Sequence, residues 1–93
     1  MKNEILNIFH SPQKYGVHAE VCNPERLTSE TREAIIRETE AFRASMTPQM
    51  IAEELDEIQP TETETPLEIA TLILERYANH DEYNTLSVSF FEI

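Results

Sequence analysis

The sequence predicts an α+β fold: a small antiparallel sheet of two to three strands packed against three helices, in the order β-α-α-α-β. Two segments, Tyr15–Cys22 and residues 85–93, alternate apolar and other residues, as half-buried strands do. Between them lie three stretches with apolar residues at helical spacing. The length of 93 residues suits one domain, so we expect a single unit over residues 1–93.

Both predicted strands place their apolar residues on one side. The inward positions of the first are Tyr15, Val17, Ala19 and Val21, and those of the second are Leu86, Val88 and Phe90. An earlier apolar cluster, Ile5 to Phe9, has a spacing that fits either a strand or one helical turn. Residues 4–10 therefore remain open, and a strand there would be the third of the sheet.

The first predicted helix begins near Thr28 or Ser29, whose hydroxyl can cap free backbone N–H groups. Its apolar face is formed by Ile35, Thr39, Phe42 and Met46. We expect Glu33 and Arg37 to pair on the solvated side, and, with less support, Thr39 and Arg43.

The other two helices share a threonine-proline start. Thr47-Pro48 opens a helix with a narrow apolar stripe that Pro60 should end. Thr65-Pro66 opens the last helix, and Glu68 completes a capping box with Thr65. This helix should extend to about Ala78, and its few polar positions predict that it is the central helix.

The charge of the chain is unevenly distributed. Residues 1–43 hold seven acids and six bases, whereas residues 44–93 hold eleven acids and one base, Arg76, a net charge of −10 of the total −11. Opposite charges at helical spacing would be stabilising and easy to encode, and self-repulsion has a cost. The asymmetry therefore favours an acidic surface suited to a basic partner, although a solvated face that maintains solubility is an equal alternative.

Composition excludes several classes of protein. No apolar run approaches the roughly 20 residues of a membrane span, and the start lacks the pattern of a signal peptide. The negative charge argues against anionic membranes and against direct nucleic-acid binding. A lone cysteine, Cys22, forms no internal disulfide, so we expect a reducing, cytoplasmic compartment.

We expect no catalytic residues, no metal and no cofactor. His18 and Cys22 are four residues apart, about 13 Å on a strand, too far for a hydrogen bond between nucleophile and base. His80, Asp81 and Glu82 are consecutive and lack zinc or calcium spacing, which favours a solvated turn. The sequence thus predicts a binding protein that is not an enzyme.

The predicted partner-binding surface consists of the acids in the second half of the chain. Carboxylates four apart on a helix lie about 6 Å from one another, similar to successive phosphates on a nucleic-acid strand. Rows of acids can therefore imitate a phosphate backbone and occupy a Lys/Arg groove. The candidate residues are Glu53, Glu54, Asp56, Glu57, Glu62, Glu64, Glu68, Glu75, Asp81 and Glu82.

In size, charge and absence of catalytic motifs the chain resembles the small phage-encoded DNA mimics, the anti-restriction and anti-CRISPR inhibitors. The resemblance covers global properties and no aligned motif. It implies a partner that is a basic nucleic-acid-binding protein: a nuclease, a restriction enzyme or a CRISPR effector.

Two alternatives remain. An immunity-type protein neutralises a toxic nuclease with carboxylates, as the small acidic barstar-like proteins do, although their element order differs. An adaptor or regulatory subunit would dock through a sheet edge, and Phe91 and Ile93 would suit strand addition or a homodimer seam.

Overall fold

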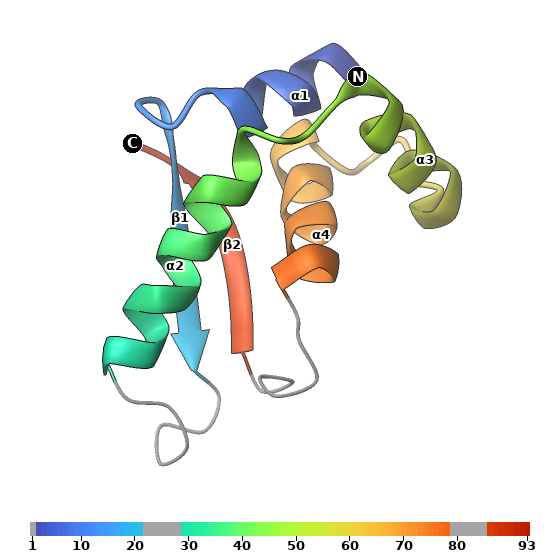
Figure 1. Cartoon of the computed structure of the whole chain (residues 1–93). Coiled ribbons are helices and arrows are strands. Elements are labelled where there is room, and N and C mark those ends of the chain that lie inside the picture. Colours follow the sequence, from blue (N-terminus) through green and yellow to red (C-terminus); the bar gives the residue numbers. More distant parts are fainter. Residues whose placement is uncertain (1, 22–28, 79–85) are drawn as a thin grey trace.

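The computed structural model describes residues 2–21, 29–78 and 86–93. The element order is α1 (Lys2–His10), β1 (Tyr15–Val21), α2 (Ser29–Arg43), α3 (Pro48–Ile58), α4 (Pro66–Ala78) and β2 (Leu86–Glu92). The fold is thus mixed α+β, with a two-stranded antiparallel sheet (Figure 1). None of these helices is long and apolar enough to cross a bilayer.

The predicted order β-α-α-α-β omitted one helix. The apolar cluster near the start forms α1 and not a third strand. Two of its buried residues, Ile8 and Phe9, lie three and four positions after the third, Ile5, so all three face one side of a helix. Alternation would have placed Ile8 and Phe9 on opposite faces of a strand. The sheet consequently has two strands, and the chain has four helices within the described residues.

The two strands pair antiparallel along their whole length. Val17 lies opposite Phe90 and Ala19 lies opposite Val88. Ala19, Val88 and Phe90 are buried, which confirms the inward face of the predicted strands. Helices α2 and α4 cover this face, and α1 lies across one end of the sheet with α3 packed beside it (Figure 1).

Helix α4 contributes the most residues to the core, as its sequence predicts. Ile69, Ala70, Ile73 and Leu74 are fully buried, and α4 packs on both β2 and α1. Aromatic rings extend the core sideways. The ring of Phe9 makes edge-on contacts with Phe42 and Phe90, with centroid distances of 6.3 and 5.0 Å.

Both threonine-proline starts form the predicted caps. The Thr47 hydroxyl accepts from the Met50 N–H at 3.2 Å, and the Thr65 hydroxyl accepts from the Glu68 N–H at 3.2 Å. Helix α3 ends at Ile58, two residues before Pro60, because Gln59 adopts a left-handed conformation and its N–H donates to the Leu55 carbonyl.

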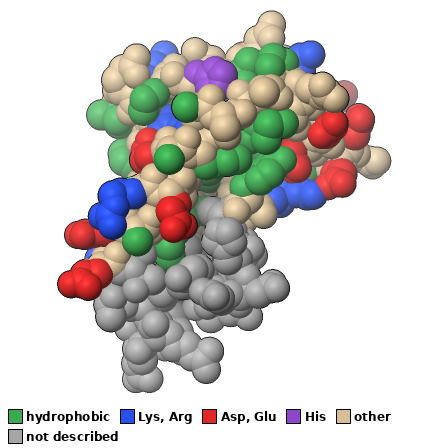
Figure 2. Space-filling model, viewed as in Figure 1, with side chains coloured by type: hydrophobic (Ala, Val, Ile, Leu, Met, Phe, Trp, Pro, Cys, Tyr) green, Lys and Arg blue, Asp and Glu red, His purple; other side chains and the backbone are tan. Residues whose placement is uncertain are grey.

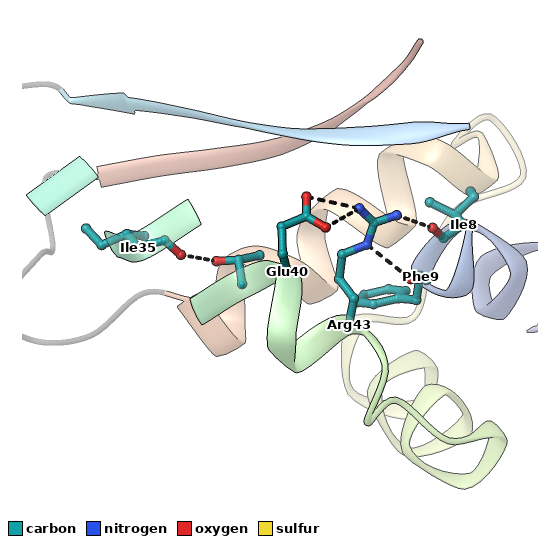
Figure 3. Close-up of polar contacts among 6 residues, drawn as sticks. Ile8, Phe9, Ile35, Glu40 and Arg43 are labelled. Atoms are coloured by element: carbon teal, nitrogen blue, oxygen red, sulfur yellow. Dashed lines mark hydrogen bonds and ion pairs between the residues drawn. The ribbon is translucent and has the colours of Figure 1, made fainter. Parts of the chain in front are cut away.

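Arg43 is buried, which corrects its predicted place on the solvated side of α2. Its Nε donates to the Phe9 carbonyl at 3.0 Å and its Nη2 to the Ile8 carbonyl at 2.9 Å (Figure 3). Its Nη1 contacts the Glu40 carboxylate at 3.0 Å, and the guanidinium lies 5.0 Å from the Phe90 ring centroid. A cation thus caps the free carbonyls at the end of α1 and fixes that helix against α2.

Two further contacts involve the sheet, one at the edge of β2 and one on the face of the sheet. The Phe90 N–H donates to the Thr71 hydroxyl of α4 at 3.1 Å, so a helix side chain satisfies a backbone donor on the outer side of β2. On the face opposite the helices, the Phe91 ring lies over Gly16, where a Cβ atom would come within 2.5 Å of Phe91 Cζ. The one glycine of the chain therefore provides space for an aromatic ring.

Candidate functional site

The structure gathers exposed acids at the end of the molecule that α3 occupies. Asp56 and Glu57 lie three and four residues after Glu53 on the solvent side of α3, and Glu62 is exposed in the connection to α4. We call these four residues the α3 acidic face. Figure 2 shows acidic side chains clustered over this end of the molecule.

Glu54 does not belong to this surface, which corrects its place among the predicted contact residues. It is 9 % exposed. Its position explains the difference: it lies three residues after Ile51 and four before Ile58, within the apolar stripe of α3. Glu54 therefore faces the protein, while the preceding residue, Glu53, is exposed to solvent.

Arg76 of α4 compensates the buried carboxylate. Its Nε lies 2.8 Å from Glu54 Oε2, and its Nη2 pairs with the exposed Glu57. Glu54 Oε2 lies at ion-pair distance from Arg76 but accepts no hydrogen bond from a described residue. The one base in the acidic half of the chain thus joins α3 to α4 and leaves Glu53, Asp56 and Glu62 without a described ion pair.

Tyr77 lies beside this arrangement, with its ring 4.8 Å from that of Phe42. Burial raises the pKa of the Tyr77 phenol above its ordinary value of 10.0, and the Glu54 carboxylate adds to the shift, because both disfavour a phenolate. The charge of Glu54 therefore makes the neighbouring Tyr77 phenol harder to ionise.

The remaining predicted contact residues have different surroundings. Glu64 is half-buried and accepts from the Thr61 N–H at 3.1 Å, so it shapes the connection between α3 and α4. Glu68 is exposed in the first turn of α4. Glu75 is half-buried and lies at hydrogen-bond distance from the Ser87 hydroxyl. Asp81 and Glu82 lie outside the described residues.

Two exposed basic residues lie away from α3, on α2. On α2, Arg32 and Arg37 are exposed and alternate with Glu33 and Glu38, and Figure 2 shows mixed charges along this helix. The structure thus separates a surface of mixed charge on α2 from a surface of one sign on α3. A uniformly acidic surface projects a field that attracts cations, whereas a mixed surface largely cancels its own.

Across residues 2–21, 29–78 and 86–93, no three His, Cys, Asp or Glu side chains gather where they could hold an ion. The predicted turn at His80 and the lone Cys22 lie outside those ranges.

Sequence reasoning missed one feature beside these acids, an open groove of about 400 Å³ along α4 and β2. Leu67, Leu72 and Phe90 line it together with Thr71, Glu64 and Glu68. An apolar residue on the outer side of α4, Leu72, was the available signal, because it falls between Glu68 and Arg76 at helical spacing.

Searches against protein-family models, curated proteins and solved structures returned no match to this chain.

Proposed function

We propose that this protein is an acidic inhibitor that binds a nucleic-acid-binding enzyme and blocks its DNA or RNA site by imitating the phosphate backbone. The intended partner is a nuclease, a restriction enzyme or a CRISPR effector. The observation that supports the proposal is the α3 acidic face. It presents Glu53, Asp56, Glu57 and Glu62 on one end of the molecule, where Arg76 pairs with Glu57.

The spacing of these acids suits such a partner. Glu53 and Glu57 are one helical turn apart, so their carboxylates repeat at about 6 Å, which is close to the spacing of phosphates along a strand. The α3 helix fixes them before binding, which reduces the entropy lost when the complex forms. A Lys/Arg groove would attract this surface from a distance and bind it in a defined orientation.

The contribution of Arg76 is to hold the surface in place. Helix α3 packs mainly on α1, and the contacts of Arg76 with Glu54 and Glu57 add a link to α4. Arg76 also cancels part of the charge of Glu57. The strongest contacts with a partner are therefore expected at Glu53, Asp56 and Glu62.

The test is affinity capture of partners from an extract of the source organism at low salt, followed by elution with a salt gradient and with duplex DNA. A phosphate mimic should release its partner to competing DNA and lose affinity steeply as salt rises. A partner whose retention is insensitive to both would exclude the proposal.

A matched pair of variants makes the test specific. Neutralising Glu53, Asp56 and Glu62 as Gln, Asn and Gln should weaken binding at least roughly tenfold. Neutralising Glu30, Glu33 and Glu38 of α2 as Gln changes the net charge equally and should have little effect. Equal losses in both variants would indicate a general charge effect and no defined surface.

An immunity protein for a toxic nuclease would use the same surface, and a toxin gene adjacent to this one would favour that form of the proposal. A second candidate, an adaptor that docks through its sheet, is favoured by the exposure of Phe91 (45 %) and Ile93 (74 %). Substitution of Ile93 by Ser would weaken an adaptor complex and would leave a phosphate mimic unaffected.

A further inference from the structure

The open groove along α4 and β2 combines an apolar floor with an acidic rim. Leu67, Leu72 and Phe90 supply the apolar part, and Leu72 is 38 % exposed. Glu64 and Glu68 are the charged residues that line it, and neither has a described cation partner.

The groove adjoins the surface already assigned to the partner. Glu68, Leu72 and Arg76 follow one another at intervals of four residues, so they lie along one stripe of α4. Arg76 at one end of the stripe contacts Glu57 of the α3 acidic face. Glu64 at the other end belongs to the connection that also carries Glu62. The same partner can therefore cover both surfaces.

Charge and polarity together define what the groove accepts. The carboxylates of Glu64 and Glu68 attract a cation, and the apolar floor is stabilised when a hydrocarbon group displaces water from it. A nucleic acid is repelled by the acids, and an anionic membrane is repelled for the same reason. A protein segment with an apolar side chain between Lys or Arg residues satisfies both parts of the groove.

We infer that this groove is a second contact site, which holds an apolar side chain of the partner flanked by Lys or Arg residues. The inference rests on the proposed function and adds a specificity element to it. Imitation of phosphates gives affinity for any cationic groove, whereas the leucine-lined groove selects partners that place an apolar side chain beside their basic residues.

Two synthetic five-residue peptides test this inference. Each contains four Lys or Arg residues, and they differ only in a central leucine or serine. They are titrated into the ¹⁵N-labelled full chain, and amide shifts are followed by NMR. We expect the leucine peptide to bind about tenfold more tightly. We also expect it to shift the amides of Thr71, Leu72 and Phe90, which the serine peptide should leave unchanged.

Two variants and a salt titration test whether the preference for leucine arises from apolar contact in the groove. Leu72→Ser should abolish the advantage of leucine over serine, whereas Ile93→Ser, an equally apolar loss outside the groove, should preserve it. The advantage should persist at high salt, because it comes from apolar contact. The amide spectrum of each variant reports its fold. Equal affinities and identical shifts for both peptides would overturn the inference.

The outcome separates this inference from the proposed function. If neither peptide shifts the amides of Glu53 and Asp56 at low salt, the α3 acidic face does not attract cations and the proposed function fails. Leucine-specific shifts at Leu72 would support the groove independently of that result.

Discussion

Arg43 Nε donates to the Phe9 carbonyl at 3.0 Å, and this bond joins the end of α2 to the end of α1 across 34 residues of sequence. The Arg43 side chain is 2 % exposed. Its donors meet two carbonyls that α1 cannot satisfy internally and one carboxylate, and this explains how a full charge is accommodated in the interior.

Substitution of Arg43 by Met should therefore destabilise the fold strongly. Met fills a similar space but leaves the carbonyls of Ile8 and Phe9 without their charged donor, so we expect a loss of about 2–4 kcal/mol in the free energy of unfolding. Urea denaturation measures the change. Arg37→Met on the exposed side of α2 is the control and should change stability by less than about 0.5 kcal/mol. Similar effects for the two variants would contradict the buried role of Arg43.

The two acids that contact Arg76 should couple to it unequally. Glu54 is buried, whereas the Glu57 side chain is 60 % exposed and its ion pair is screened by solvent. Double-mutant cycles with Arg76→Gln should give a coupling of about 1 kcal/mol with Glu54→Gln. The cycle with Glu57→Gln should give about 0.3 kcal/mol. Chemical denaturation of the single and double variants provides both values, and a larger coupling at Glu57 would refute this assignment.

The effect of Gly16→Ala on stability should change sign with the residue at position 91. In the natural chain the new Cβ meets the Phe91 ring and displaces it, and we expect a loss of about 1 kcal/mol. In a Phe91→Ala background the space is free, and alanine is less costly than glycine to order in a strand, so the same change should stabilise by about 0.5 kcal/mol. Thermal unfolding of the four variants tests the reversal. A destabilisation that is independent of residue 91 would show that another contact is responsible.

Tyr77 should be harder to ionise than a free tyrosine. Because the folded protein holds the phenolic proton more tightly than the unfolded chain does, the stability that this proton provides is fully present below pH 10.0. It is lost as the pH rises through the raised pKa of the folded state. Glu54→Gln should lower the Tyr77 pKa without restoring the free value, because burial is the larger cause. The ¹³Cζ shift of Tyr77 followed against pH measures both effects, and a pKa unchanged by Glu54→Gln would exclude the electrostatic contribution.

Local signals in the sequence predicted most of the fold. Alternation identified both strands and their inward faces, and the threonine-proline pairs located the starts of α3 and α4. These features depend on neighbouring residues, so a single sequence contains them. The α1 segment was ambiguous because its four apolar residues are too few to establish a period, and only packing against α3 and α4 shows which face is buried.

The two charged residues that the sequence misplaced, Arg43 and Glu54, share a common cause of error. Arg43 and Glu54 were assigned to solvent because they are charged, although both occupy positions within the apolar stripes of their helices. The groups that make their burial tolerable, the carbonyls of α1 and the guanidinium of Arg76, come from distant segments of the chain. A charged residue at an apolar position predicts burial with a partner, but the sequence alone does not name that partner.

The hydroxyl of Thr71, which accepts the Phe90 N–H, has a consequence for how this protein behaves at high concentration. The unpaired edge of a short sheet can pair with strands from other chains, and repeated pairing of this kind produces fibrils. Here a helix residue occupies the hydrogen-bonding position that an incoming chain would need at Phe90. This contact therefore opposes strand addition at Phe90, and it does so without a charged residue on the edge strand.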